Sequence, residues 1–249
     1  MDYTKINSEV VDGWVAAGWQ WGQPISQKEY IQAKQGDFQL VLTPTKPIPS
    51  HWYPENLKEL KVLGLAAGGG QQMPILCALG ANCTVLDYSS KQLEQEKLVA
   101  EREGYQIEII QGDMTKKLPF DDESFDLIIH PVSNCYVEEV QPIWQECYRV
   151  LKKNGRLLSG LDNGFNYVVD ETQKKIVQSL PYNPIKNPSL LLNQDISESG
   201  VQFSHTLEEQ IRGQLQAGFQ LVDLYEDTNG SGFLHEMNIP SFWATYTIK

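Results

Sequence analysis

The chain has 249 residues, 41% of them hydrophobic, and a formal net charge of −12 at pH 7. This length suits one α/β domain with additions and a sizeable core, and the acidic balance disfavours nucleic acid as a partner. No run of about 18 apolar residues is present that could span a membrane. Residues 1–5 lack the basic and apolar runs of a signal peptide, so we expect a cytoplasmic protein without a membrane partner.

The cysteines give no sign of a metal site. They form no CxxC pair and no Cys/His cluster with zinc-ligand spacing, and they stand at positions 77, 83, 135 and 147. Cys77, Cys83 and Cys147 lie among apolar residues, which favours small buried side chains. We therefore expect no bound metal.

Residues 1–55 differ in composition from the rest of the chain and are interpreted as an N-terminal cap. They contain four of the six tryptophans, namely Trp14, Trp19, Trp21 and Trp52. Residues 38–42 fit a short strand, and the prolines that follow keep residues 43–49 in a loop.

One helix is predicted inside this cap. Ser26 and Glu29 form a capping-box pattern for a helix towards Lys34, and Gly36 ends it.

From residue 56 to residue 249, strand and helix patterns alternate. Apolar runs predict strands at residues 61–66, 82–87, 106–110, 124–130, 156–161, 219–225 and 242–248. Helical patterns lie between them, at residues 71–79, 89–104, 137–151 and 206–217. We expect Asn154-Gly155 to end the third of these helices.

Residues 164–200 interrupt this alternation with a polar, proline-containing insertion after the fifth strand. The alternation itself predicts an α/β fold with a doubly wound, Rossmann-like parallel sheet and right-handed crossovers. The N-terminal cap and the insertion would be additions to that sheet, and the insertion is expected to shape a substrate pocket.

A loop of small residues, Ala66 to Gly70, joins the first strand to the next helix. Small residues let a ligand approach the backbone, at the sheet edge where ligands bind in open α/β folds. A G-x-G-x-x-G/A dinucleotide fingerprint fails here, because its last position falls on Met73 or Gln71. No Lys-Ser/Thr pair completes a phosphate loop either, which favours a ligand without phosphates.

Two carboxylates follow the next strands. Asp87 ends the second strand and can accept hydrogen bonds from both hydroxyls of a ribose. Asp113, in Gly112-Asp113-Met114 after the third strand, can accept from an adenine amino group, while Met114 offers a backbone N–H and an apolar face. Gly-Asp is also a common turn pair.

These motifs, with residues 118–128 (LPFDDESFDLI) and 148–155 (YRVLKKNG), resemble the class I S-adenosylmethionine (SAM)-dependent methyltransferases, in particular their small-molecule branch. The resemblance covers residues 61–160 and, more loosely, 207–248. It implies a seven-stranded sheet whose last strand is antiparallel. It also implies SAM as the cofactor.

By position, the resemblance assigns the cofactor-binding residues. The small residues of the first loop would line the methionine and ribose parts, Asp87 would hold the ribose hydroxyls, and Tyr88, Asp113 and Met114 would surround the adenine. The full set is Gly64, Ala66, Gly68, Gly70, Gln71, Asp87, Tyr88, Asp113, Met114 and His130.

Two positions depart from the family pattern. Gly64 stands where an acidic residue is common, and Ala66 replaces the first glycine of the loop. Holding the methionine ammonium would then fall to backbone carbonyls or to cap residues.

The candidates for the reacting end follow the fourth strand. His130 could act as a general base near neutral pH or simply hydrogen-bond cofactor or backbone. Asn134 and Tyr136 could orient the substrate or serve structure alone. Cys135 is not expected to act as a nucleophile, because transfer from SAM needs no covalent enzyme intermediate.

Other residues could also reach the substrate. Asp162-Asn163 follows the fifth strand at the same edge, and His205 and His235 lie in later loops. The cluster of Trp14, Trp19 and Trp21 could cover the sulfonium by cation–π contact or pack the cap.

The predicted function is transfer of a methyl group from SAM to a small molecule. Three alternatives stay open from the sequence: a SAM-binding protein without catalysis, an NAD-dependent oxidoreductase on a related fold, and an RNA methyltransferase. The failed dinucleotide fingerprint counts against the second and the net charge against the third.

Overall fold

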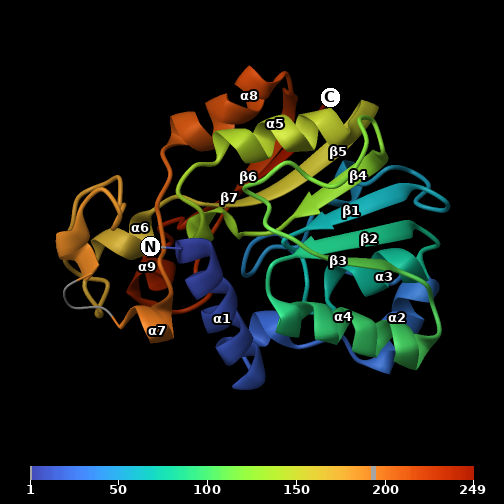
Figure 1. Ribbon diagram of the computed structural model, residues 1–249, viewed down its shortest axis with the longest axis horizontal. Helices are drawn as coiled ribbons and strands as arrows, with labels where there is room; N and C mark the ends of the chain where they lie inside the picture. Colours follow the sequence, from blue (N-terminus) through green and yellow to red (C-terminus); the bar gives the residue numbers. More distant parts are fainter. Residues whose placement is uncertain (1, 192–194) are drawn as a thin grey trace.

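A seven-stranded sheet forms the centre of the molecule (Figure 1). The computed structural model describes residues 2–191 and 195–249. The strands are β1 (Lys61–Leu65), β2 (Asn82–Asp87), β3 (Glu108–Gln111), β4 (Phe125–His130), β5 (Leu151–Asp162), β6 (Gln220–Asp227) and β7 (Phe242–Ile248). They lie in the order β3-β2-β1-β4-β5-β7-β6, and β7 runs antiparallel to both of its neighbours. The predicted fold class is confirmed.

Helices cover both faces of the sheet. Figure 1 shows α5 and α8 on one side, and α2, α3 and α4 on the other. The α-helices are α1 (Tyr3–Ala16), α2 (Gln27–Lys34), α3 (Gln72–Ala78), α4 (Ser90–Glu103), α5 (Gln141–Val150), α6 (Phe165–Val168), α7 (Ile196–Ser199), α8 (Gly213–Ala217) and α9 (Gly232–Glu236). Short helical turns lie at Gln20–Gly22, Ser50–Trp52, Asn134–Tyr136, Pro188–Leu191 and Glu208–Arg212.

The strands contribute side chains to two apolar cores, one on each face of the sheet. Side chains alternate along a strand, so Val62 joins one core while Leu63 and Leu65 join the other. All three are fully buried, as are Trp52 in the first core and Trp144 of α5 in the second. Burying an aliphatic side chain completely contributes about 1.5–3 kcal/mol. The central strands are therefore apolar on both faces, as the sequence pattern predicts.

The predicted strand at residues 38–42 is wrong. This segment forms only an isolated bridge between Val41 and Pro47, and it docks on the sheet instead, where the backbone N–H of Val132 donates to Leu42 O at 3.1 Å. Gly160 of β5 makes the approach possible, because a Cβ there would lie 2.1 Å from Leu42 O. The docked segment carries Thr43 and Pro44 over the ends of β4 and β5.

The predicted boundary between the 137–151 helix and the fifth strand is also wrong. Helix α5 ends at Val150 and β5 begins at Leu151, so Asn154-Gly155 lies inside the strand. The register with β4 slips between Phe125↔Leu151 and Leu127↔Arg156. Asn154 takes a left-handed conformation (φ 63) in this irregular stretch, so it kinks the strand and does not cap the helix.

The predicted capping box of Ser26 with Glu29 is present, with both of its reciprocal hydrogen bonds. Thr206 and Glu209 make the same pair of bonds at the start of the Glu208–Arg212 turn. At α4 the Ser89 hydroxyl accepts from Gln92 N at 3.1 Å, but Asp87 accepts the Ser89 N–H in place of Gln92.

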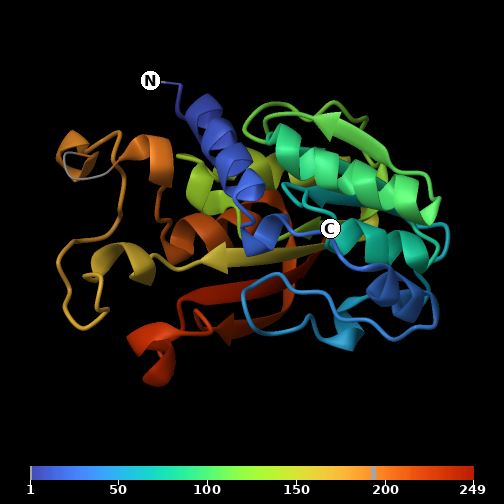
Figure 2. The same ribbon diagram turned by 90° about the horizontal axis from the view of Figure 1, so that it is seen from below.

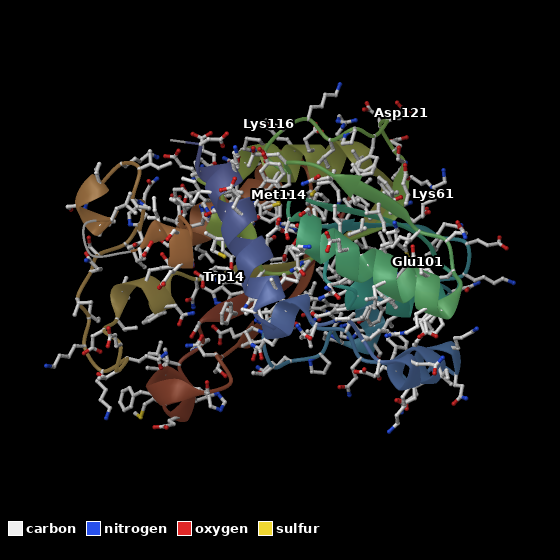
Figure 3. All side chains as sticks on the ribbon, turned by 60° about the horizontal axis from the view of Figure 1, so that its bottom comes forward. Trp14, Lys61, Glu101, Met114, Lys116 and Asp121 are labelled. Atoms are coloured by element: carbon white, nitrogen blue, oxygen red, sulfur yellow. The ribbon has the colours of Figure 1, made fainter. Side chains whose placement is uncertain are left out.

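Helix α1 lies between α4 and the insertion, as Figures 2 and 3 show. On the α4 side, the Asp12 carboxylate accepts from Ser89 Oγ at 2.5 Å, Ser90 Oγ at 2.8 Å and Lys91 N at 3.0 Å. One free backbone N–H and two serine hydroxyls at the start of α4 thus donate to a side chain of α1.

The opposite side of α1 is held by Asn7. Its Nδ2 donates to Val201 O at 2.8 Å and to Tyr136 O at 3.0 Å, and its Oδ1 accepts from Val201 N at 2.6 Å. Since Asn7 is 5% exposed, these bonds form out of contact with water.

In the described part of the chain, no helix has the length and apolar character needed to cross a membrane.

We predict that Gly160→Ala destabilises the protein by about 1–3 kcal/mol, because the added methyl group collides with Leu42 O. Urea unfolding followed by tryptophan fluorescence measures this. Gly13→Ala is the matched control, because nothing lies within 4 Å of a Cβ at this exposed helical position. It should stabilise by about 0.5–1 kcal/mol. Equal effects of the two substitutions would contradict the close approach at Gly160.

Candidate functional site

Two connected cavities open at the carboxyl ends of the parallel strands. The larger measures about 470 Å³ and the smaller about 90 Å³. Both are lined by Val11, Ala66, Asp87, Ser133 and Tyr136, so they form one two-part site. This is the edge at which open α/β sheets bind ligands.

The loop after β1 forms the floor between the two cavities. Ala66 adopts a left-handed backbone (φ 48), and its N–H donates to Leu86 O of β2 at 2.8 Å. Gly68 N donates to Asp87 Oδ2 at 3.0 Å. A Cβ on Gly68 would lie 2.6 Å from Gln92 Cβ, so only glycine lets the loop lie this close to α4.

Asp87 lies where the two cavities meet. Its Oδ1 accepts from Ser89 N at 2.9 Å, and the residue as a whole is 9% exposed. Burial raises its pKa to about 6, although hydrogen bonds from Ser89 and Gly68 backbone groups act in the opposite direction. The carboxylate is therefore fixed by backbone N–H groups where the two cavities meet.

The smaller cavity lies beside β3 and beneath α1. Its base is lined by Tyr88, Gly112, Asp113 and Met114, and its cover includes Thr4, Asn7 and Ser8 of α1. Ser8 Oγ donates to Tyr88 O at 2.9 Å, which fastens the cover to the base. Figure 3 shows Met114 next to α1.

Most of the predicted cofactor residues line these cavities. They are Ala66, Gly68, Gln71, Asp87, Tyr88, Asp113 and Met114. Gly64 does not, because the Met73 side chain packs on it and a Cβ there would lie 2.8 Å from Met73 Sδ. That thioether fills the place where a side chain at position 64 would begin.

Gly70 also lies outside the cavity lining. Its N–H donates to Glu96 Oε1 at 2.8 Å, and a Cβ there would lie 2.9 Å from Pro24 Cβ. Burial raises the pKa of the fully buried Glu96 to about 8, so its carboxyl group is largely protonated at neutral pH. Gly70 thus fixes the back of the loop against α4.

The structure does not bring His130 and Asn134 into the cavity lining. The two ring nitrogens of the fully buried His130 lie 2.9 Å from Leu65 O and 2.9 Å from Asn134 Oδ1. Burial lowers the pKa of His130, which favours the neutral ring. Asn134 Nδ2 donates to Gln210 Oε1 at 3.0 Å. These groups tie the ends of β1 and β4 together, and neither ring nitrogen is free to act as a base.

Tyr136, the third predicted catalytic residue, does line both cavities. Its neighbour Cys135 lines the larger one, and burial raises the pKa of both groups. Cys135 is therefore a neutral thiol, in agreement with the expectation that it is no nucleophile.

The end of β5 supplies the second carboxylate of the larger cavity. Asp162 is 5% exposed, its Oδ1 accepts from Gly164 N at 2.6 Å, and burial raises its pKa to about 7. Tyr167, Asn166 and Gln202 lie around the same cavity, and Tyr167 Oη donates to Gln202 Oε1 at 2.8 Å. Sequence reasoning missed these last three. Their position in or next to an insertion after the fifth strand was the only available signal.

The cap contributes aromatic side chains. Trp19 and Trp21 line the larger cavity, whereas Trp14 packs against Trp19 with ring centroids 5.3 Å apart. His205 and His235 do not line it. His205 is buried with Nε2 2.9 Å from Asn134 O, and His235 lies beside Thr228.

The arrangement fits SAM. A buried carboxylate stands between a small cavity with an Asp-Met pair and a larger cavity floored by a small-residue loop. An adenine in the first and a methionine in the second would place the ribose against Asp87. Among residues 2–191 and 195–249, no group of three metal-ligating side chains is found.

Comparison with known proteins gives the same assignment. Residues 63–159 match a family model described as a methyltransferase domain. The "uncharacterized methyltransferase YbaJ" of Bacillus subtilis is 42% identical over 98% of this chain and 97% of its own length. A demethylmenaquinone methyltransferase of Clavibacter sepedonicus is 35% identical over 39% of each chain.

Solved structures share the fold. A SAM-dependent methyltransferase of Mesorhizobium loti has a TM-score of 0.61 at 18% identity, covering 80% of this chain and 94% of its own. The 1,6-didemethyltoxoflavin-N1-methyltransferase of Burkholderia thailandensis has a TM-score of 0.63 at 13% identity, covering 100% and 89%. With a relative that matches almost its whole length and with this fold, the chain belongs to the class I SAM-dependent methyltransferases.

Proposed function

We propose that this protein transfers the methyl group of SAM to a small molecule bound between the end of β5, the cap and the insertion. One observation carries the proposal: the larger cavity continues past the loop after β1 into a space lined by Trp19, Thr43, Asp162 and Tyr167. These side chains come from outside the SAM-binding motifs, so they are available to a second ligand.

In this proposal Asp87 accepts hydrogen bonds from the ribose hydroxyls, and Asp113 and Met114 hold the adenine. Ala66, Gly68 and Gln71 line the methionine part. Bound SAM supplies a methyl group activated by its sulfonium, so the protein's task is to align an acceptor and exclude water.

The cap and the insertion supply that alignment. We infer that residues 1–55 act as a cap and that residues 164–200 shape the substrate pocket, because Trp21 and Tyr167 line the cavity from these two segments. Among the described residues of 164–200, Asn166 and Tyr167 line the cavity, and Gln202 lies just beyond this segment.

His130 and Asn134 have positioning roles in this proposal. Their bonds to Leu65 O and Gln210 fix the loop that carries Tyr136. Tyr136 is the predicted catalytic residue that remains at the cavity, where its hydroxyl group would orient the acceptor.

Isothermal titration calorimetry with SAM and with S-adenosylhomocysteine (SAH) tests the first half of the proposal. We expect one molecule of either to bind per chain. Absence of binding would contradict the cofactor assignment. Binding without SAH production over a broad acceptor panel would instead favour a non-catalytic SAM-binding protein.

We predict that Asp87→Ala weakens SAM binding by about 1–3 kcal/mol, through loss of hydrogen bonds to a charged acceptor. The same calorimetric titration measures this. Glu101→Gln removes one negative charge from the exposed surface of α4 and should leave the affinity unchanged. Figure 3 shows Glu101 at the far end of that helix from α1. Similar affinities of the wild type and Asp87→Ala would refute the ribose contact.

SAM affinity should also depend on pH through Asp87. The pKa of this carboxyl group is raised to about 6, and ribose hydroxyls donate best to its ionised form. Affinity should therefore be constant above about pH 6 and fall below it, approaching tenfold per pH unit. Titrations between pH 5 and pH 8 measure the profile. Asp87→Asn should flatten this profile. The same pH dependence in both proteins would show that a group other than Asp87 causes it.

A further inference from the structure

The charges that line the larger cavity are all of one sign. Among the described residues that line it, the ionisable carboxylates are Asp87 and Asp162, and there is no lysine, arginine or histidine. The smaller cavity adds Asp113 and again no cationic side chain from the described part of the chain. A carboxylate or phosphate on the acceptor would find no counter-charge from these side chains.

Asp162 is the carboxylate on the acceptor side. Its Oδ1 is held by Gly164 N at 2.6 Å, and a hydrogen bond from the Asn166 side chain also favours its ionised form. The charge of Asp162 acts on Cys135, Tyr136 and Tyr167, and it helps to raise the pKa of each of them. A carboxylate so placed, with no cationic partner among the described residues that line the cavity, is stabilised by a ligand that brings a positive charge or an N–H group.

The walls around this carboxylate are aromatic. Larger-cavity residues with rings are Trp19, Trp21, Tyr136, Tyr167 and Phe242. Aromatic faces attract cations and stack on planar rings. The aromatic walls therefore favour a flat or cationic ligand, and the carboxylate favours a cationic one. Both disfavour an anion.

We propose that the methyl acceptor is a nitrogen compound, an amine or an N–H heterocycle without an anionic group, whose N–H donates to Asp162. This inference rests on the proposed methyltransferase function and names its substrate class. The attacking nitrogen is neutral, so an acceptor that binds as an ammonium ion first releases one proton to solvent. The nitrogen lone pair then forms the new bond to the methyl carbon, the carbon–sulfur bond breaks with its electron pair remaining on sulfur, and a proton on the methylated nitrogen passes to the Asp162 carboxylate.

The direction of charge movement favours nitrogen over oxygen. A nitrogen that attacks a sulfonium gains positive charge, which the Asp162 carboxylate and the aromatic faces stabilise. An oxygen acid that ionises before it attacks would place negative charge in a buried space that contains carboxylates and no cationic side chain from the described residues.

Three probes that share one ring test the charge preference. Tryptamine is a cation, 3-methylindole is neutral and indole-3-acetate is an anion. Each is titrated by calorimetry into the SAH-saturated enzyme at about pH 8, where Asp162 is ionised. We expect tryptamine to bind at least about tenfold more tightly than indole-3-acetate, with 3-methylindole between them.

Two variants locate the preference. Asp162→Asn keeps an oxygen that can accept from Gly164 N, and it should reduce the tryptamine-to-acetate ratio by about tenfold while SAH affinity is retained. Glu171→Gln removes the same charge from an exposed position in the insertion and should leave the ratio unchanged. If Asp162→Asn does not fold, the affinities of the wild-type protein for tryptamine and indole-3-acetate still test the proposal.

The inference is overturned if indole-3-acetate binds as tightly as tryptamine, if none of the three probes binds, or if Asp162→Asn binds SAH and keeps the wild-type ratio. The preceding SAH titration separates this result from failure of the proposed function. An enzyme that does not bind SAH contradicts the methyltransferase proposal itself, whereas one that binds SAH with the wrong charge preference contradicts only the nitrogen acceptor.

Discussion

The buried carboxylate of Asp87 is the constraint on which the cofactor side of this structure depends. It accepts one N–H from the loop after β1 and another from the start of α4, so it joins three segments at one point. Removing a carboxylate from water costs several kcal/mol, and hydrogen bonds from backbone donors offset part of that cost. The part of this cost that the hydrogen bonds do not offset raises the pKa of Asp87. In the proposed function, a pair of ribose hydroxyls would complete the solvation of this group.

Much of the sheet could be predicted from the sequence because its signals are local. β2 and β7 have the bounds that their apolar runs predict, and α4 and α8 end at glycines in left-handed conformations, Gly104 and Gly218, close to the predicted helix ends. The predicted cofactor residues Asp87 and Met114 line the cavities for the same reason, since one ends β2 and the other lies in the loop after β3. Such short patterns predict local structure correctly because they do not depend on residues far away in the sequence.

Features that depend on distant partners could not be predicted in this way. On its insertion side, helix α1 is held by Asn7, which bonds to Val201 far along the chain. Residues 38–42 have the composition of a strand, but the glycine that receives them is Gly160. His130 ends a strand at the ligand-binding edge, yet its ring turns towards Leu65 O because the Trp144 core packs against it. In each case the position of the segment or side chain depends on a contact with a residue that lies far away in the sequence.

The two-sided docking of α1 has a consequence for turnover. Asp12 fastens the helix to α4 beside the ribose position, and Asn7 fastens it to the chain that follows the insertion. The spent cofactor and the methylated product would therefore leave past the same element, and undocking it would loosen both ends of the site at once. Such coupling makes the residence times of the two products interdependent. The cycle of the enzyme would then be paced by the opening of a helix, and the bonds that hold that helix would set its speed.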